Sequence, residues 1–204
     1  MKAAFFTLFF LLFSGCIDTA YAAEDTALKG GAFDPPRVAP DFSLRGSDGT
    51  ELKLSRYRGK LVVLEFGYTS CFDVCPTSLA MLAQVRKKLG ALAADVQIVY
   101  VTVDPERDTV AILKPYLAVF DPSFVGATGS PEQLARVRKD YGISATKNMM
   151  PGSKPGSKTA YTMSHSSYLY LIDRQGSLRS MMPFGSGVDD VAHDVRILLN
   201  TQKK

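Results

Sequence analysis

The chain has 204 residues, of which 46% are apolar, with no tryptophan and a formal net charge of +4 at pH 7. This length and composition suit one globular domain with its own core and leave little room for a second. Lys and Arg are spread along the chain rather than gathered in blocks, so the charge pattern argues against a nucleic-acid-binding surface.

The first 22 residues have the pattern of a secretory signal peptide. Lys2 precedes the apolar run 3–13, which is shorter than the about 20 residues that a membrane-spanning helix needs. Two processing sites remain open: cleavage after Ala22 in "AYA", or lipoprotein processing in "FSGC" with a lipid on Cys16. We therefore expect export to a periplasm or to the outer face of an inner membrane, with a membrane anchor at Cys16 as one alternative.

Composition divides the rest of the chain into a linker and a domain. Residues 23–40 are rich in Gly, Pro and polar residues, which predicts a linker. The domain is then expected to span 41–204. It opens with two short alternating runs within 41–54 around Asp48-Gly49, a pattern that predicts a β-hairpin.

Buried strands and amphipathic helices are expected to alternate after this hairpin. Dense apolar runs predict strands over 60–67, 96–105, 124–129, 166–173 and 177–185. Apolar spacing, caps and turn residues predict helices over 76–90, 106–120, 130–142 and 188–200. The remaining segment, 143–163, contains "PGSKPGSK" and is expected to be a mobile flap. This order predicts an α/β, thioredoxin-like domain with a central mixed sheet, helices on both faces and an N-terminal β-hairpin extension.

Downstream of the signal region the chain has two cysteines, Cys71 and Cys75, in "GYTSCFDVCP". They lie between a predicted strand and its helix, where the amide groups of the helix start are expected to lower thiol pKa values. Their spacing puts both side chains on one face of a helical turn. Two such sulfurs can act as a redox-active pair that forms a disulfide, or can bind one soft metal ion. A purely structural disulfide is the weaker interpretation, because so short a loop gains little on closure.

A third ligand would separate these uses, and there are two histidines to consider. His165 precedes the strand 166–173, whose start lies beside the thiol loop in a thioredoxin-like layout. Two thiolates and one imidazole suit Cu(I) or Cu(II), whereas structural zinc normally takes four protein ligands. The alternative for His165 is a loop histidine bonded locally. His193 lies off the apolar stripe of the last helix and is expected to be solvated.

Four segments together resemble Sco/SenC proteins: "GYTSCFDVCP" (67–76), "VTVDPERDT" (101–109), "FVGATGS" (124–130) and "SHSSYLYLIDRQGSLR" (164–179). The resemblance covers roughly residues 38–200 and implies a thioredoxin-like fold. It also implies that Cys71, Cys75 and His165 bind a single copper ion. The implied function is that of a metallochaperone that assists assembly of the copper site of cytochrome c oxidase, with the oxidase copper-site subunit or another copper chaperone as partner.

Two residues depart from the Sco/SenC pattern. Phe72 stands where the family usually has proline, and Ser164 stands where an acidic residue often precedes the histidine. Loss of that carboxylate is expected to change how the imidazole is oriented. Asp73, between the cysteines, matches the family pattern, and a role at the helix start is its alternative interpretation.

The segment "VTVDPERDT" predicts a turn between a strand and a helix. Asp104-Pro105 suits the turn, and Asp108 or Thr109 is expected to cap the helix. Because the carboxyl ends of strands line sites in α/β sheets, this turn is also expected to border the copper site. In the flap, Met149 and Met150 are either thioethers that pass copper along or exposed residues without a role.

Glu65 supports an alternative function, a thiol–disulfide reductase that works without metal and keeps a client's copper-ligand cysteines reduced. It lies six residues before Cys71, where thioredoxins have a buried acid that could exchange protons with Cys75. The other interpretation of Glu65 is a side chain at the surface. Thioredoxins usually have a cis-proline before the strand at 166–173, and no proline stands there, which favours copper binding. A peroxide-reducing enzyme is weaker still, because such enzymes do not usually pair thiols at this spacing.

Overall fold

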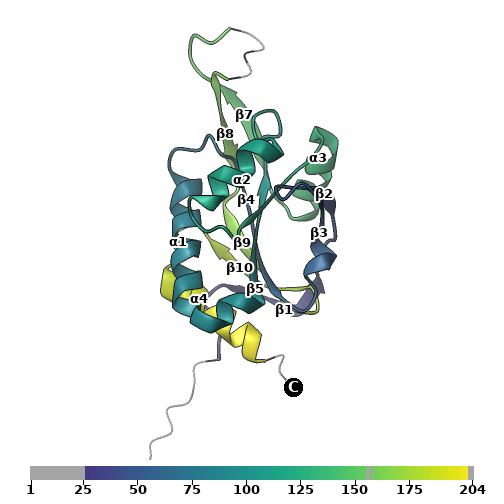
Figure 1. Ribbon diagram of the computed structural model, residues 1–204, viewed down its shortest axis with the longest axis vertical. Helices are drawn as coiled ribbons and strands as arrows, with labels where there is room; N and C mark the ends of the chain where they lie inside the picture. The colour runs from purple at the N-terminus through teal and green to yellow at the C-terminus, as the bar shows by residue number, and fades with distance from the viewer. Residues whose placement is uncertain (1–25, 155–156, 158, 202–204) are drawn as a thin grey trace, which may run out of the picture.

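The computed structural model of the protein describes residues 26–154, 157 and 159–201. The strands in chain order are β1 (Gly31–Val38), β2 (Ser43–Gly46), β3 (Glu51–Lys53), β4 (Leu61–Gly67), β5 (Val96–Thr102), β6 (Val125–Thr128), β7 (Ala145–Met149), β8 (Tyr161–His165), β9 (Tyr168–Ile172) and β10 (Ser177–Pro183). The helices are α1 (Val74–Leu89), α2 (Val110–Ala118), α3 (Pro131–Asp140) and α4 (Val188–Asn200), and Figure 1 shows their arrangement. The predicted signal peptide and Cys16 lie outside the described residues.

The parallel pair β4–β5 lies at the centre of an eight-stranded sheet in the order β1-β10-β9-β4-β5-β6-β2-β3. The pair β5–β6 is also parallel, whereas the other pairs in this sheet are antiparallel. Both central strands are β-branched and almost wholly buried, as expected for strands covered on both faces. The sequence-based prediction of a central mixed sheet is confirmed, with β2 and β3 as the N-terminal hairpin.

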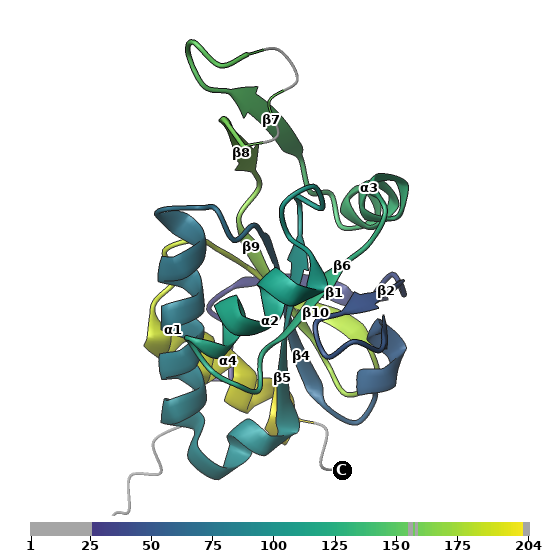
Figure 2. The ribbon, with the colours of Figure 1, turned by 45° about the horizontal axis from the view of Figure 1, so that its top comes forward.

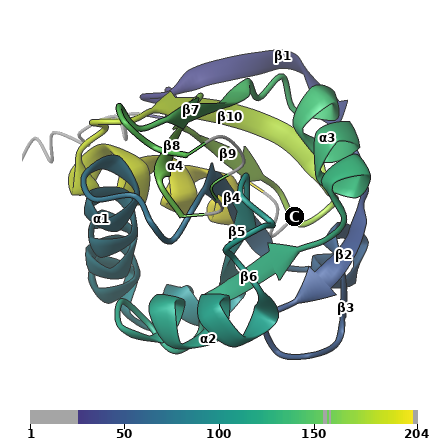
Figure 3. The ribbon, with the colours of Figure 1, turned by 90° about the horizontal axis from the view of Figure 1, so that it is seen from above.

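Alternate residues of the central strands belong to two separate cores. Leu61 and Val63 pack with α1, α2 and α4 on one face, whereas Val62, Leu64 and Phe66 pack with α3 and the β2–β3 hairpin on the other. Figure 3, seen from above, shows α1, α2 and α4 along one side of the sheet and α3 on the other. Two helical layers around one sheet are the thioredoxin-like arrangement that the sequence predicts.

The predicted linker is wrong for residues 31–38. These residues form β1, an edge strand that pairs with β10 despite its two prolines. The register shifts between Ala32 and Arg37, so Pro35 and Pro36 lie where the ladder is interrupted. An edge strand with such an irregularity needs no amide donor at those positions, which explains why a proline-rich sequence can join a sheet.

The predicted flap is also largely wrong. Residues 145–149 and 161–165 form a two-stranded antiparallel sheet of their own, β7–β8, which we call the arm. Figure 2 shows the arm projecting beyond the body between the ends of α1 and α3. Its strands are mostly exposed or half-buried, so their sequence lacks the apolar alternation that usually identifies a strand.

Helix boundaries differ from prediction in two places. Helix α1 begins at Val74, two residues before Pro76, and therefore includes Cys75. Helix α2 covers only Val110–Ala118, because residues 104–109 form a turn closed by its own backbone hydrogen bonds. Among the described helices, none has both the length and the apolar character to cross a bilayer.

Candidate thiol and imidazole site

The two thiols lie in the connection between β4 and α1. Strand β4 ends at Gly67, where an added Cβ would stand 2.3 Å from the hydroxyl oxygen of Tyr100, so glycine lets the chain pass. The amide of Cys71 then donates to the carbonyl of Tyr68, at 3.3 Å. Cys75 follows in the first turn of α1 and is 1% exposed, whereas Cys71 is half-buried, and both are free thiols. Only Cys71 is therefore open to an incoming reactant.

His165, at the end of β8, faces Cys75 across this connection. Its Nε2 atom lies 3.5 Å from the Cys75 sulfur, and its Nδ1 atom lies 2.9 Å from the carbonyl oxygen of Ser166. Because a carbonyl oxygen only accepts, Nδ1 must carry the proton, which leaves the Nε2 lone pair directed at the sulfur. The ring of Tyr68 packs edge-on against the imidazole at 5.8 Å between ring centres. His165 is thus bonded locally through Nδ1, as the alternative interpretation expected, while its Nε2 atom remains available to bind a ligand.

Burial keeps both facing groups neutral. It lowers the pKa of His165, so the imidazole is uncharged near neutral pH. Burial also raises the pKa of the Cys75 thiol well above its ordinary value. The sequence-based expectation of a lowered thiol pKa is therefore wrong for Cys75, because desolvation outweighs the favourable effect of the helix start.

The Cys71 sulfur has a different partner as the site stands. It accepts a hydrogen bond from the amide of Cys75, at 3.4 Å between nitrogen and sulfur. The described part of the chain contains no group of three His, Cys, Asp or Glu side chains already arranged as a metal site. As the chain stands, Cys71, Cys75 and His165 are therefore not drawn together closely enough to hold one ion. A donor set of two sulfurs and one imidazole nitrogen suits copper.

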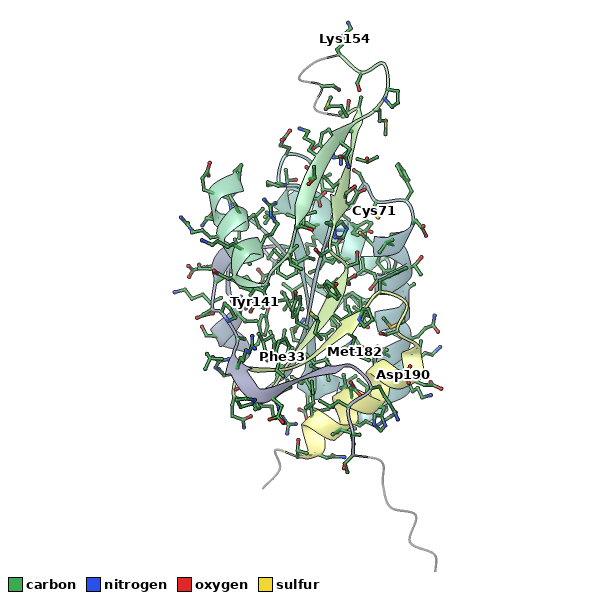
Figure 4. All side chains as sticks on the ribbon, turned by 180° about the vertical axis from the view of Figure 1, so that it is seen from behind. Phe33, Cys71, Tyr141, Lys154, Met182 and Asp190 are labelled. Carbon is green, nitrogen blue, oxygen red and sulfur yellow. The ribbon has the colours of Figure 1, made fainter. Side chains whose placement is uncertain are left out.

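A shallow groove of about 370 Å³ opens beside the thiols. Its lining residues are Tyr68, Cys71, Phe72, Asp73, Val74, Met163, Ser164, His165 and Ser167. Phe72 is 88% exposed at its rim. Figure 4 shows Cys71 near the root of the arm and Lys154 at its far end. The groove gives a partner direct access to Cys71.

Asp108 braces the thiol loop instead of capping α2. Its fully buried carboxylate accepts from the amide and hydroxyl of Thr69, at 3.0 and 2.5 Å, and from the hydroxyl of Thr102, at 2.6 Å. Thr109 occupies the N-cap position without a side-chain hydrogen bond. The predicted capping role is therefore wrong for both residues, although the turn does border the site as predicted.

Asp104 and Arg107 hold the arm from the same turn. The hydroxyl of Tyr161 donates to the Asp104 carboxylate at 2.7 Å, and Arg107 donates to the Tyr161 carbonyl at 3.0 Å. The Arg107 guanidinium also lies 3.8 Å from the centre of the Tyr161 ring and pairs with Asp104. The sequence analysis did not identify Tyr161 or Thr69 as members of the site. The only indication of their role was the polar segment "VTVDPERDT", which contains the residues that they bond.

One departure from the family pattern, Ser164, has a local explanation. Ser164 accepts from the Asn148 side chain at 2.7 Å, a contact between the two strands of the arm. The imidazole is instead oriented by the carbonyl of Ser166, so the missing acidic residue does not leave it without a partner. Asp73 stands at the N-cap of α1 with no side-chain capping bond.

The other candidate residues lie apart from the thiols. His193 is half-buried on α4 and donates to the carbonyl of Ala27 at 3.0 Å, so it is not the solvated residue that was expected. Met149 is 44% exposed and pairs with Tyr161 in the arm, four residues along β8 from His165, and Met150 is 42% exposed. The structure brings neither methionine to the site.

Glu65 is buried on the α1 side of the sheet. Its side chain is 5% exposed, and its Oε2 atom has no hydrogen-bond partner. Burial raises the pKa of Glu65 to about 8, and a hydrogen bond with Ser78 offsets part of that rise. The interpretation of Glu65 as a surface residue is therefore wrong.

The chain matches a protein-family model over most of its length. The SCO1/SenC family model matches residues 31–200. The chain belongs to the SCO1/SenC family. A curated member, the SCO2-like protein of Rickettsia felis, is 34% identical over 143 residues, which cover 70% of this chain and 68% of that protein. The match begins where β1 begins, so the edge strand belongs to the family domain.

Solved structures of Sco proteins have the same fold. The copper-bound ScoI of Bradyrhizobium japonicum is 35% identical with a TM-score of 0.69, over 79% of this chain and 99% of that one. BsSco, described with a disulfide switch and as a member of the Sco family of cytochrome c oxidase assembly proteins, is 26% identical with a TM-score of 0.62, over 82% and 96%. Copper and a switchable disulfide are thus both found among the relatives.

Proposed function

We propose that this SCO1/SenC chain is an exported copper metallochaperone that serves assembly of the copper site of cytochrome c oxidase. Its single copper ion would be held by Cys71, Cys75 and His165. The observation that carries the proposal is the 3.5 Å approach of the Cys75 sulfur to the unprotonated Nε2 atom of His165. The copper-bound ScoI relative supports the metal, and the description of BsSco supports the link to the oxidase.

Each residue has a distinct part in taking up and releasing copper as cargo. His165 is neutral and its lone pair is already directed inward, so it binds without losing a proton. Cys75 must give up its proton, because thiolate is the form that binds a metal. The half-buried Cys71 is the sulfur that a client ligand reaches first in the groove. Release would then follow by exchange of Cys71 for a client thiolate.

Oxidation of the thiols would stop copper binding. Closure of the Cys71–Cys75 disulfide removes two electrons and two protons and leaves no thiolate for the metal. The partner would be the oxidase copper-site subunit or another copper chaperone. Export, with or without a lipid on Cys16, is supported by the pattern of residues 1–22.

The test is an anaerobic titration of the reduced chain lacking residues 1–22 with Cu(I) and Cu(II) against a competing chelator. One tightly bound copper per chain is expected. Cys71→Ser should abolish tight binding, and His165→Ala should weaken it at least about tenfold, since even the outer partners of a metal ligand are worth about 10–100-fold. His193→Ala is the matched histidine control and should bind as the natural chain does. Equal binding by all four proteins would contradict the proposal.

Glu65 favours a second candidate function, the metal-free thiol–disulfide reductase. A buried carboxyl with a pKa of about 8 can exchange a proton near neutral pH, which disulfide exchange requires. This function predicts that copper-free protein reduces a peptide disulfide with a rate that falls in Glu65→Gln. Unchanged reduction by Glu65→Gln, together with tight copper binding by the natural chain, would leave the metallochaperone as the better account.

A further inference from the structure

The turn Asp104–Asp108 contacts both halves of the candidate site. Its last residue, Asp108, bonds Thr69, two residues before Cys71. Its first residue, Asp104, together with Arg107, bonds Tyr161, four residues before His165. Thiols and imidazole come from segments about 90 residues apart in the chain, and this one turn touches both segments.

The turn itself is fixed to the centre of the sheet. Thr102, the last residue of β5, is fully buried and donates its hydroxyl to Asp108 while accepting from the amide of Asp104, at 2.6 and 2.9 Å. The amide of Asp108 donates to the carbonyl of Asp104 at 2.9 Å, which closes the turn. The neighbouring amide of Val103 donates to the carbonyl of Gly67 at 2.8 Å. Hydrogen bonds therefore attach the turn to the ends of both central strands, β4 and β5.

The arm depends on such a support because no described strand of the main sheet pairs with it. At its root, the amide of Ser166 donates to the carbonyl of Ser144 at 3.0 Å. Further along, Tyr161 is 1% exposed and its hydroxyl reaches the Asp104 carboxylate, which is itself 3% exposed. Side-chain contacts with the turn thus hold β8, which ends at His165, in addition to the backbone bond at the root.

We propose that Asp108 and Tyr161 are positioning residues through which the Asp104–Asp108 turn sets the thiol loop and the histidine strand independently. Asp108 acts on the thiol pair, and Tyr161 acts on His165. The copper part of this inference rests on the proposed function. The positioning part concerns the metal-free protein and can be measured without copper.

The two ends of the turn should respond differently to mutation. Asp108→Asn removes the charge that accepts from Thr69, and hydrogen bonds to charged groups are stronger than those between neutral groups. Because these bonds are made with the loop in its dithiol form, we expect the thiol–disulfide equilibrium with glutathione to shift about tenfold toward the disulfide, about 30 mV. Tyr161→Phe removes only the hydroxyl on the arm. It should leave that equilibrium within about twofold and weaken copper binding about tenfold.

Matched controls separate positioning from general loss of stability. Asp173→Asn removes a buried carboxylate that accepts from the amides of Gln175 and Ser177, far from the thiols in sequence. Tyr141→Phe removes a hydroxyl that donates to the carbonyl of Pro40 at 2.8 Å. Neither control should move the glutathione equilibrium or the copper affinity by more than about twofold. If Asp108→Asn does not fold, Thr69→Ala removes the same hydroxyl bond from a half-buried position.

The experiment measures the glutathione equilibrium, amide hydrogen exchange and copper affinity of the full set of variants. In copper-free protein, Asp108→Asn should speed exchange in 67–73, and Tyr161→Phe should speed it in 161–165, each without affecting the other segment. A glutathione shift in Asp108→Asn no larger than in Asp173→Asn, or the same exchange pattern in both variants, would overturn the proposal. If the natural chain fails to bind copper, the proposed function falls while these two copper-free readouts still decide the positioning.

Discussion

At the scale of single residues, Glu65 makes the stability of the fold depend on pH. Its pKa is about 8 in the folded protein against an ordinary 4.5. Between these values the folded chain holds a proton that the unfolded chain has released, so stability falls as pH rises. The loss is about 1.4 kcal/mol per pH unit across this window. Glu65→Gln carries no such proton, and the difference in unfolding free energy between variant and natural chain should grow from pH 5 to pH 8.

Urea unfolding at pH 5, 6, 7 and 8 measures this difference. Glu132→Gln is the matched control, because Glu132 is exposed on α3 and its pKa is lowered rather than raised. It should show no trend over the same range. A constant difference between Glu65→Gln and the natural chain would mean that the carboxyl keeps its ordinary pKa in the folded state.

Some members of the candidate site could be found from the sequence and others could not, and the difference lies in how common their residue types are. Cys71, Cys75 and His165 belong to scarce residue types in this chain, so their spacing and family pattern stood out. Thr69 and Tyr161 are common types whose role depends on hydrogen bonds to the distant turn. The raised pKa of Cys75 also escaped prediction, since the sequence shows its place at a helix start but not its burial.

At the scale of elements, the buried strands and helices were predicted from the sequence, whereas the exposed strands were not. The strands β4 and β5 are continuous buried apolar runs, the helix α4 buries apolar residues at helical spacing, and each was predicted. Strand β1 is exposed along most of its length and contains two prolines, and the arm is largely exposed. Their pairing comes from backbone hydrogen bonds and a few anchors, which hydrophobic periodicity does not reveal.

Strand β1 should therefore be a necessary part of the domain. A chain beginning at Asp41, the predicted domain start, lacks both β1 and the buried Ala39, whereas one beginning at Thr26 keeps them. Removing β1 exposes the edge of β10. It also exposes the part of the core against which Phe33 of β1 packs. We expect the shorter chain to lose on the order of 2 kcal/mol of unfolding free energy and to associate through the exposed edge.

Urea unfolding and light scattering of the two chains test this expectation. The control is Asp194→Asn in the longer chain, which weakens the contacts of the buried Asp194 with the amides of Lys29 and Gly30 and keeps β1 in place. It should cost less than the truncation. Equal stability and a monomeric state for both chains would show that the domain does begin at residue 41.

At the scale of the whole molecule, the candidate site and the start of the described chain lie at opposite ends. The arm rises from one end, and α4, where Lys29 and Gly30 dock on Asp194, lies toward the other (Figures 1 and 4). The groove at the arm's root is therefore clear of the segment that leads back to residue 26. A partner can approach Cys71 without displacing any part of the described fold.

Copper uptake by the whole protein should release protons in a pattern that identifies the ligands. The Cys75 thiol is protonated at pH 7 because burial raises its pKa, so it must lose a proton when it binds copper. His165 is neutral because burial lowers its pKa, so it loses none. We expect at least about one proton per copper bound at pH 7, with an apparent affinity that rises about tenfold per pH unit for each proton released.

Titration of reduced protein with Cu(I) in weakly buffered solution, followed with a pH indicator, measures this release. His165→Ala should bind more weakly while releasing as many protons per copper as the natural chain, since its imidazole contributes none. Cys75→Ser should lose the Cys75 proton along with tight binding. Fewer protons from His165→Ala than from the natural chain would mean that the His165 imidazole carries a proton on Nε2 before copper binds, which contradicts the neutral form that its burial favours.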